Sequence, residues 1–383
     1  MSGIYIHFPF CKQACHYCDF HFSTSLHKKE AMLNALKKEI KLRKSEFKDE
    51  VVETIYFGGG TPSLLSMDEL RFLLDEVYEN YNIVPSPEIT LEANPDDLSS
   101  IKINDLYKSP VNRLSIGIQS FFEEDLKLMN RAHNAEEASR CIKEAQDAGF
   151  ENISIDLIYG IPGMSNERWI QNIEKTLAFQ IPHISSYALT VEPRTALEKL
   201  IEKGRIAPVD DELAHQHFLS LVTILKENNF VHYELSNFGK PGFFSKNNTA
   251  YWLGKKYIGI GPSAHSYDGN HRGWNIANNP KYIKALSNNE LPLEIETLSK
   301  KDRYNEYIMT GLRTIWGVST ERVVCDFGML SKQHLLKQAE KYIKEGLLEI
   351  VTDKATEVLR TTRKGKFLCD GIASDLFLLN LEK

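Results

Sequence analysis

Three cysteines near the start of the chain have the type and spacing of a metal-binding loop. The run CKQACHYC contains Cys11, Cys15 and Cys18, so all three thiols can turn toward one point. Thiolates at such close spacing hold iron–sulfur clusters or zinc. The position two beyond Cys18 is Phe20, and no fourth cysteine lies nearby. A four-iron cluster held by three thiolates leaves one iron with an open coordination position, which is typical of a reactive cluster rather than a purely structural one.

Two other uses of these cysteines have to be weighed. A disulfide is disfavoured because three thiols cannot all pair and nothing marks the chain as secreted. A zinc site made of the three cysteines with His16 or His21 fits the same spacing, so the loop alone leaves it open. The other cysteines are scattered, and we expect them to be small buried apolar residues: Cys141, Cys325 and Cys369.

Length and composition describe an ordinary globular protein. The 383 residues predict two domains, and 42% hydrophobic with 26% charged residues is typical of a soluble enzyme. The net charge of −6 gives no excess of positive charge to attract phosphates, so nucleic acid is not expected as a partner. There is no apolar run of membrane-spanning length and no signal-peptide pattern. We therefore expect a cytoplasmic protein without a transmembrane segment, whose only membrane contact would be peripheral.

Strand patterns alternate with helical patterns in the first half of the chain. The expected strands cover residues 4–8, 51–57, 88–95, 111–120, 152–162 and 183–193. Helices are expected between them, for instance over 28–44 and 135–148, where apolar side chains recur at helical spacing. Ser66 and Glu69 form a predicted capping box ahead of another helix. Such alternation predicts a parallel sheet with helices outside it.

Polar and glycine residues gather where these strands end. The cysteine loop follows the first strand and the run GGGT follows the second. Later strands carry Glu92, Asn94, Gln119 and Asp156 near their ends. Working residues of (β/α) barrels lie at the carboxyl ends of the strands, and convergence on one mouth fits a barrel better than the crevice of a flat doubly wound sheet. The predicted fold is therefore α/β, with an incomplete six-stranded (β/α) barrel.

The alternation ends beyond residue 193. A helix is expected over 210–228, and the stretch 243–269, rich in Gly, Asn and aromatic residues, predicts a binding loop rather than regular structure. The tail has helical patterns over 303–316 and 332–345 and short strand patterns around LLEIV and FLCDG, which predict a small winged-helix-like α+β domain. The expected regions are a barrel, a connecting region and a C-terminal domain, over 1–235, 236–300 and 301–383.

The cysteine loop and five further motifs resemble a known family. In chain order they read YIHFPFC, GGGTPS, LEANP, RLSIGIQS, MNRAH and IDLIYGIP. They are similar to the radical S-adenosylmethionine (SAM) proteins, and among these to the oxygen-independent coproporphyrinogen III oxidase branch. The likeness runs from residue 4 to about residue 265 and resumes in the tail. It implies a barrel of radical-SAM type, a 4Fe–4S cluster on the three loop cysteines, and SAM on the open iron.

The resemblance also implies which residues hold SAM. Taken one at a time, Glu92, Gln119, Arg131 and Asp156 would each pass for an ordinary surface or hydrogen-bonded residue. Together they suit a zwitterionic nucleoside, which needs a cation for its carboxylate and acceptors for its ammonium and hydroxyl groups. Many relatives carry Glu where this chain has Gly60. The residues implied are Tyr5, Tyr17, Gly59, Gly60, Thr61, Glu92, Gln119, Arg131 and Asp156.

Two features divide the branch by function. The oxidase, which decarboxylates two propionates of coproporphyrinogen III, carries a fourth cysteine where this chain has Phe20. It also has a longer segment ahead of the barrel, whereas this chain begins three residues before its first expected strand. Both departures resemble the haem chaperones of the superfamily, which bind haem and pass it to acceptor proteins. We predict such a chaperone, with the oxidase as the alternative, and leave enzymatic activity open.

The resemblance implies further partners and a haem-binding loop. It implies haem, haem-accepting proteins and an electron donor of flavodoxin or ferredoxin type. In these chaperones an HNxxYW motif follows the barrel, and its His is associated with haem binding. Here the stretch reads NNTAYW, so an Asn amide, a poor iron ligand, replaces the imidazole at Asn247. The matching positions are Asn248, Tyr251 and Trp252.

Three side chains are candidates for contacting the haem. His265 is the nearest alternative axial ligand, although a histidine hydrogen-bonded within its own loop explains it equally well. Tyr251 could ligate as a phenolate. We expect Tyr251 and Trp252 rather to stack on the porphyrin face.

Overall fold

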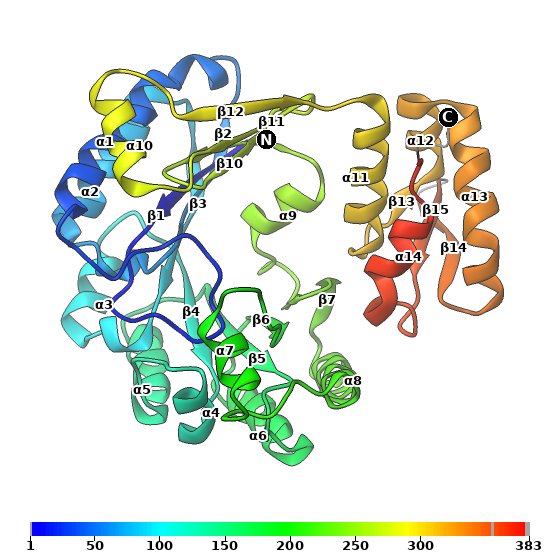
Figure 1. The fold of residues 1–383 in the computed structure, drawn as a ribbon, viewed down its shortest axis with the longest axis horizontal. Coiled ribbons are helices and arrows are strands. Elements are labelled where there is room, and N and C mark those ends of the chain that lie inside the picture. The colour runs from blue at the N-terminus through cyan, green and yellow to red at the C-terminus, as the bar shows by residue number, and fades with distance from the viewer. Residues whose placement is uncertain (1, 354–355, 380–383) are drawn as a thin grey trace.

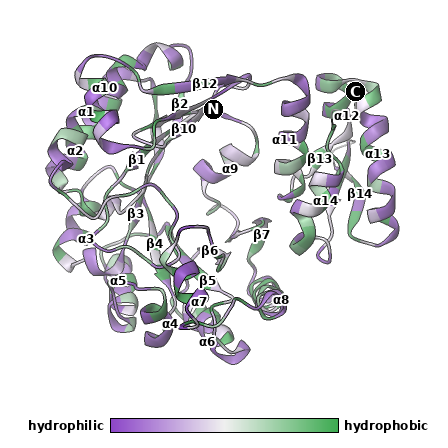
Figure 2. Cartoon of the chain, in the orientation of Figure 1, coloured by the Kyte–Doolittle hydropathy of each residue, from purple (hydrophilic) through white to green (hydrophobic). Residues whose placement is uncertain are grey.

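The computed structural model describes residues 2–353 and 356–379 and contains two hydrophobic cores (Figure 1). The larger core is built from residues between Ile4 and Leu286, and the smaller one from residues between Tyr304 and Leu376. Helices such as α8 (Asp211–Glu227) and α13 (Met329–Lys344) carry hydrophobic and hydrophilic residues side by side (Figure 2). Each helix thus has an apolar stripe to bury against a sheet.

The six predicted parallel strands are confirmed. They pair with one another in chain order: β1 (Ser2–Phe8), β2 (Val52–Gly59), β3 (Ile83–Ala93), β4 (Arg113–Gln119), β5 (Ile153–Tyr159) and β6 (His183–Ala188). The connecting helices are α1 (Lys29–Leu42), α2 (Met67–Asn80), α3 (Ser100–Tyr107), α4 (Glu123–Leu128), α5 (Ala135–Asp147), α6 (Asn166–Ala178) and α7 (Ala196–Glu202). The capping box of Ser66 and Glu69 is present at the start of α2.

The two faces of the strands differ in chemistry. On β1 the alternate residues Ile4, Ile6 and Phe8 are fully buried in the larger core, against the covering helices. The residues between them point to the inside, where Tyr5 stacks on Tyr56 of β2 with ring centroids 6.0 Å apart. The inside of the sheet is therefore polar and aromatic, unlike the filled apolar interior of a closed eight-stranded barrel.

The prediction that residues 243–269 lack regular structure is wrong. They form helix α9 (Lys246–Trp252) and strands β9 (Lys256–Ile260) and β10 (His265–Tyr267). β9 pairs in parallel with β1, and β10 is followed by the antiparallel strands β11 (His271–Asn275) and β12 (Leu293–Thr297). An edge strand offers unpaired backbone groups, and β9 satisfies those of β1 despite its glycine content. A side chain at Gly259 would strike the backbone carbonyl of His265, so glycine is required there.

The main sheet is thus larger than predicted. Beyond β6 it continues through β8 (Asn237–Gly239) and β7 (Val231–Glu234), both antiparallel to their neighbours. The described residues place twelve strands in one sheet, in the order β12-β11-β10-β9-β1-β2-β3-β4-β5-β6-β8-β7. The sheet curves but keeps two free edges, and α9 lies on its inner side between the strands and the C-terminal helices (Figure 1).

A buried ion pair on α1 joins the added strands to the barrel. Arg43 donates to Glu39 Oε1 over 3.1 Å, and both side chains are almost completely buried. Each also reaches across to the added elements, including α10 (Asn279–Ser287). Arg43 donates to the carbonyl of Gly259 and the hydroxyl of Ser266, while Glu39 accepts from the backbone of Gly261 and the side chains of Asn275 and Tyr282. One helix thus holds β9, β10, β11 and α10 in place.

The C-terminal residues form a separate α+β layer. Its helices are α11 (Lys300–Leu312), α12 (Thr320–Phe327), α13 and α14 (Cys369–Asp375), and its antiparallel sheet has the order β13 (Val318–Ser319), β15 (Thr356–Thr361) and β14 (Leu348–Asp353). The predicted winged-helix-like class agrees with this, but the strand expected around FLCDG is wrong, since residues 366–375 are helical. The β-branched run TEVLRT supplies the strand instead.

The three region bounds are not tested by this architecture and stay predictions. Residues 1, 354–355 and 380–383, which fall within them, lie outside the described residues. In the part of the chain that the structure describes, every helix is too short or too polar to cross a membrane.

We expect Glu39→Ala to destabilise the protein strongly. Arg43 would keep Glu46 as a counter-charge, but the buried donors of Gly261, Asn275 and Tyr282 would lose their acceptor. Each buried donor left unsatisfied costs about 1–3 kcal/mol. Glu30 on the same helix is exposed, and Glu30→Ala should change the free energy of unfolding by no more than about 0.5 kcal/mol. Thermal and denaturant unfolding would measure both. Equal stability of the two variants would contradict the role given to this pair.

Candidate functional site

A cavity of about 390 Å³ lies at the carboxyl ends of the parallel strands. Its walls come from the cysteine loop, the glycine-rich turn after β2, the segment after α4, and the ends of β3 to β6. Eleven of the predicted cluster and SAM residues line it: Cys11, Cys15, Tyr17, Cys18, Gly59, Gly60, Thr61, Glu92, Gln119, Arg131 and Asp156. The volume falls within the range of ligand-sized pockets.

The cysteine loop is anchored by its backbone and leaves its thiols free. The N–H of Cys11 donates to the carbonyl of Ser23 over 3.1 Å, and that of Cys18 to the carbonyl of Cys15 over 3.4 Å. All three thiols are unbridged and half-buried. Burial raises the pKa of Cys11 to about 11 and that of Cys18 to about 12. These groups therefore stay protonated at neutral pH unless a metal displaces the proton.

The zinc alternative requires His16 or His21 to join the three thiols, and each of these histidines has one ring nitrogen hydrogen-bonded elsewhere. His16 Nδ1 is hydrogen-bonded to the carbonyl of Leu128 over 2.8 Å, and His21 Nε2 to Asn279 Oδ1 over 2.7 Å. Across residues 2–353 and 356–379, no three His, Cys, Asp or Glu side chains converge as the ligands of a single metal ion. A four-iron cube does not require the three thiolates to meet at one metal ion, because each thiolate bonds a different iron.

Arg131 ties the cysteine loop to the strand ends. Its Nη1 donates to Cys15 Sγ over 3.3 Å, and its Nη2 donates to Asn94 Oδ1 over 2.7 Å and to the carbonyl of Gly117 over 2.9 Å. The buried Nε has no hydrogen-bond partner among the described residues. The guanidinium thus presents an unused donor beside the cavity, which suits the carboxylate of a bound ligand.

Two carboxyl groups face the same cavity. Glu92 accepts from the hydroxyl of Tyr56 over 2.8 Å and from the N–H of Gly59 over 3.2 Å. Burial raises the pKa of Glu92 to about 7, and it raises the pKa of Asp156 to about 6. Ser115 donates to Asp156 Oδ1 over 3.3 Å. With these pKa values, both carboxyls can ionise near neutral pH and then accept hydrogen bonds from an ammonium or hydroxyl group.

Gln119 holds a strained backbone at the end of β4. Its φ of 60° lies in the left-handed region, and the pairing of β4 with β5 shifts by one residue at this point. The buried Oε1 has no hydrogen-bond partner in the described part of the chain. A strained residue with an unpaired acceptor at a cavity wall is typical of a ligand-binding position.

Gly60 lies where the turn after β2 approaches the cysteine loop most closely. The N–H of Gly60 donates to the carbonyl of Phe8 over 2.8 Å, and the N–H of Thr61 donates to the carbonyl of Phe10 over 2.7 Å. A Cβ at Gly60 would lie 2.5 Å from the Phe10 carbonyl oxygen. The glycine therefore lets the turn press its backbone against the start of the cysteine loop.

Tyr5 does not share the cavity with the other implied SAM residues. It lies on the inner face of β1, where its hydroxyl is 3.2 Å from Nδ1 of His7 and its ring stacks on Tyr56. The distance along β1 explains this, because the cavity forms where the strands end and Tyr5 is three residues before that point.

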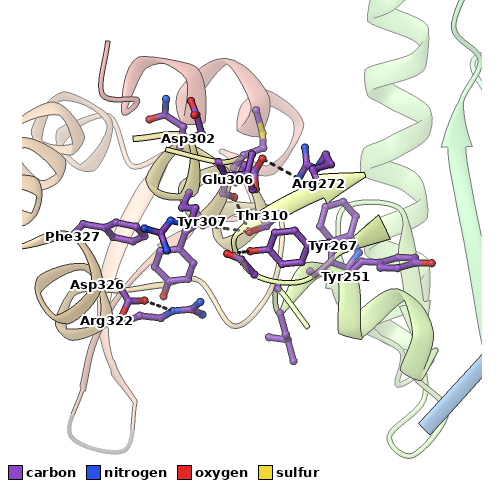
Figure 3. A pocket seen from close by; sticks show the side chains of 18 of the residues that line it. Tyr251, Tyr267, Arg272, Asp302, Glu306, Tyr307, Thr310, Arg322, Asp326 and Phe327 are labelled. Carbon is purple, nitrogen blue, oxygen red and sulfur yellow. Dashed lines mark hydrogen bonds and ion pairs between the residues drawn. The ribbon is translucent and has the colours of Figure 1, made fainter. Parts of the chain in front are cut away.

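The haem candidates separate into two groups. Tyr251 and Trp252 line a second cavity, of about 760 Å³, between β9–β12 and the C-terminal helices (Figure 3). Asn248 and His265 lie outside the linings of both cavities. Asn248 donates its N–H to the hydroxyl of Ser245, the cap of α9, and His265 lies on β10 with its ring centroid 6.3 Å from that of Trp274.

Asn247, where relatives carry the motif His, is buried and already bonded. Its Oδ1 accepts from the hydroxyl of Thr54 over 3.1 Å, and its N–H donates to Glu88 over 3.1 Å. These contacts fix the start of α9 to β2 and β3, so Asn247 has a structural role.

Sequence reasoning missed part of both cavity walls. Tyr187 and Phe22 line the first cavity, and Arg272, Arg303 and Arg322 line the second. These residues belong to elements that are distant in sequence and share no motif, so only the fold brings them together.

The comparisons with known proteins agree with this architecture. The Radical SAM superfamily model matches residues 5–176, and the HemN C-terminal domain model matches residues 298–368. The coproporphyrinogen III oxidase HemN of Escherichia coli superposes with a TM-score of 0.85 over 98% of this chain and 90% of that chain, at 22% sequence identity. At that identity the likeness establishes the fold alone.

The sequence relatives establish the family. The haem chaperone HemW of Bacillus subtilis is 34% identical, with 86% of this chain and 87% of the relative aligned. The haem chaperone HemW of Lactococcus lactis is 36% identical over 97% of this chain and 98% of the relative. Radical-SAM membership implies a 4Fe–4S cluster and SAM. The chain therefore belongs to the radical SAM superfamily and, within it, to the family of the haem chaperone HemW.

Proposed function

We propose that this protein is a haem chaperone that holds a 4Fe–4S cluster and SAM at the mouth of its barrel and delivers haem to acceptor proteins. The observation that carries the proposal is the convergence of three free cysteines with Arg131, Glu92 and Gln119 on one cavity. The names of the full-length relatives support the haem part.

The residues present fit the cluster and SAM. Cys11, Cys15 and Cys18 would hold the cluster, which in this superfamily supplies one-electron chemistry to SAM. Arg131 would pair through its unused Nε with the ligand's carboxylate. The acceptors for its ammonium and hydroxyl groups would be Gln119 Oε1 and the carboxyls of Glu92 and Asp156, with Tyr17, Gly59, Gly60 and Thr61 as further walls.

His265 is the axial ligand that we propose for haem iron. Burial, together with the nearby charge of Arg272, lowers the pKa of His265, which favours the neutral imidazole that iron binds. Burial raises the pKa of Tyr251, which disfavours a phenolate there. Tyr251 and Trp252 are then aromatic walls rather than ligands, and Asn248 supports them on α9.

The remaining expectations belong to the same proposal. We place the protein in the cytoplasm, with haem-accepting proteins and an electron donor of flavodoxin or ferredoxin type as partners. The oxidase alternative lacks support at Phe20, which lines the first cavity, is 67% exposed and occupies the position of the oxidase's fourth cysteine.

Each loop cysteine should be needed for iron. Cys11→Ala, Cys15→Ala or Cys18→Ala should lose most of the iron bound after anaerobic reconstitution, because two thiolates hold a cube poorly. Cys141→Ala and Cys325→Ala are matched controls and should keep the full iron content. Iron and sulfide analysis with absorption spectra would measure this. Stoichiometric zinc in anaerobically purified protein would refute the cluster assignment.

Haem binding should depend on His265. His265→Ala should weaken haem binding or shift the Soret band, since it removes the proposed ligand. His271 lies on the next strand, is exposed and is hydrogen-bonded to Asp268, so His271→Ala is the control and should leave the spectrum unchanged. Absorption titration with haem would compare them.

The same preparation tests the chaperone against the oxidase. With a reduced cluster and SAM, the protein should release no carbon dioxide from coproporphyrinogen III. SAM-dependent decarboxylation of that substrate would overturn the chaperone proposal in favour of the oxidase.

Glu92 should make the ligand-free protein less stable as the pH rises. Its pKa is about 7 in the folded chain, against an ordinary value of 4.5, so the folded state keeps the proton in this range while the unfolded chain loses it. Stability therefore falls between about pH 4.5 and 7, by at most about 3 kcal/mol. Glu92→Gln should flatten this slope in calorimetric scans at pH 5 and pH 8. An unchanged slope would show that Glu92 is ionised in the folded protein.

A further inference from the structure

The second cavity lies where the two hydrophobic cores face each other. One wall is the inner face of β9 to β12, continued by the end of α9. The opposite wall comes from α11 and α12. With about 760 Å³ it is nearly twice as large as the cavity at the cysteine loop, and it falls in the range of sites for large organic ligands. None of the loop cysteines and none of the implied SAM residues lines it.

Aromatic rings form much of its surface. Tyr251 meets Tyr257 edge to face with ring centroids 4.5 Å apart, and Tyr257 lies 6.3 Å from Tyr267 on the neighbouring strand. Tyr307 and Phe327 face them from α11 and α12 (Figure 3). Rings on two opposed walls suit a flat, largely apolar ligand.

Three arginines enter the same space. Arg272 pairs with Glu306 over 2.9 Å, and Arg322 pairs with Asp326 over 3.1 Å and lies 4.3 Å from the centre of the Tyr307 ring. Arg303 donates through Nη1 to Asn270 Oδ1 over 2.9 Å, and its buried Nε has no hydrogen-bond partner in the described chain. These contacts fix the guanidinium groups and leave donors for an incoming carboxylate.

The carboxyl groups of the cavity narrow the choice of ligand. Glu306 and Asp326 are paired with arginines, and Asp302 accepts from the backbone and hydroxyl of Ser299 at the start of α11. Glu296 lies opposite Arg272 on β12. With acids and arginines interleaved, the cavity is a poor site for a polyanion such as a nucleotide. A ligand with few carboxylates on a broad apolar body fits better.

We infer that this cavity is the haem site and that Arg303 and Arg322 bind the haem propionates. The inference rests on the proposed function, which supplies the ligand class, but it assigns a site and a set of residues that the relatives' names do not. Haem is a flat macrocycle with two carboxylates on one edge, which matches opposed aromatic walls and arginines from one side.

His265 does not line this cavity, but it lies on a strand that does. On β10, His265 and Tyr267 lie on one face because alternate residues of a strand share a face. Tyr267 lines the cavity. The His265 side chain therefore lies on the same face of β10, two residues or about 7 Å along the strand from Tyr267. An iron ligand beside the cavity and propionate ligands within it would hold the macrocycle across β10 and β11.

Absorption titrations of the full-length protein with haem and with haem dimethyl ester would test the assignment. The ester keeps the macrocycle and iron but lacks the propionate charges. The unmodified protein should bind haem at least about ten-fold more tightly than the ester. Arg303→Gln and Arg322→Gln should each weaken haem binding by roughly ten- to a hundred-fold and leave ester binding within about two-fold. Arg71→Gln, which changes an exposed side chain on α2, is the control.

Each outcome bears on a different statement. Equal affinity of the unmodified protein for haem and its ester, or unchanged haem affinity in both arginine variants, would overturn this site while leaving the chaperone proposal intact. A variant that binds neither haem nor the ester would also count against a propionate role. The exception is an Arg303→Lys variant that keeps the positive charge and recovers binding of haem but not of the ester. Failure of the unmodified protein to bind haem would overturn the proposed function itself.

Discussion

The open side of the barrel is the constraint on which the rest of the structure depends. A parallel sheet that does not close leaves two edges with unpaired backbone groups and a polar interior exposed on one side. β9 covers one edge and β8 the other, while α9 packs into the opening (Figure 1). The backbone N–H groups of Lys246 and Asn247 donate to Glu88 on β3, so the start of this helix meets a carboxylate, as the helix dipole favours. The C-terminal layer then covers what the barrel leaves open.

This closure creates two cavities with a thin aromatic layer between them. On the side of the cysteine loop, Tyr56 donates to Glu92 in the cavity wall. Tyr5 stacks behind Tyr56, and its pKa is raised by burial, then by Glu92 and by Tyr251. Tyr251 in turn lines the second cavity. Tyr5, which the resemblance assigned to SAM, therefore lies behind Tyr56 rather than in the wall of the first cavity.

The parts of the fold that the sequence predicts are those whose signals are local. The six parallel strands carry apolar residues toward the helices, and the capping box at Ser66 marks where α2 begins, so both were predictable. β9 and β10 were not predictable, because the glycines, asparagines and tyrosines in and around them are typical of loops. They become ordered because β9 pairs with the open edge of β1. The site divides in the same way. Ordered motifs found the residues of the first cavity, whereas Arg272, Arg303 and Arg322 meet only after two cores pack together.

The change from His to Asn at position 247 follows from the same packing. Were Asn247 simply a lost ligand, its side chain would face an open site, but the residue is buried. Its side-chain Oδ1 accepts from Thr54 and its backbone N–H donates to Glu88. A Cβ at Gly3 would lie 3.5 Å from Asn247 Oδ1 and 2.6 Å from the Thr54 hydroxyl, so the wall beside the amide leaves little room. An imidazole in this position would therefore have to fit beside Gly3 and Thr54 on the inner face of β1 and β2. This packing is consistent with our proposal that the haem ligand comes from another element of the inner face, namely His265 on β10.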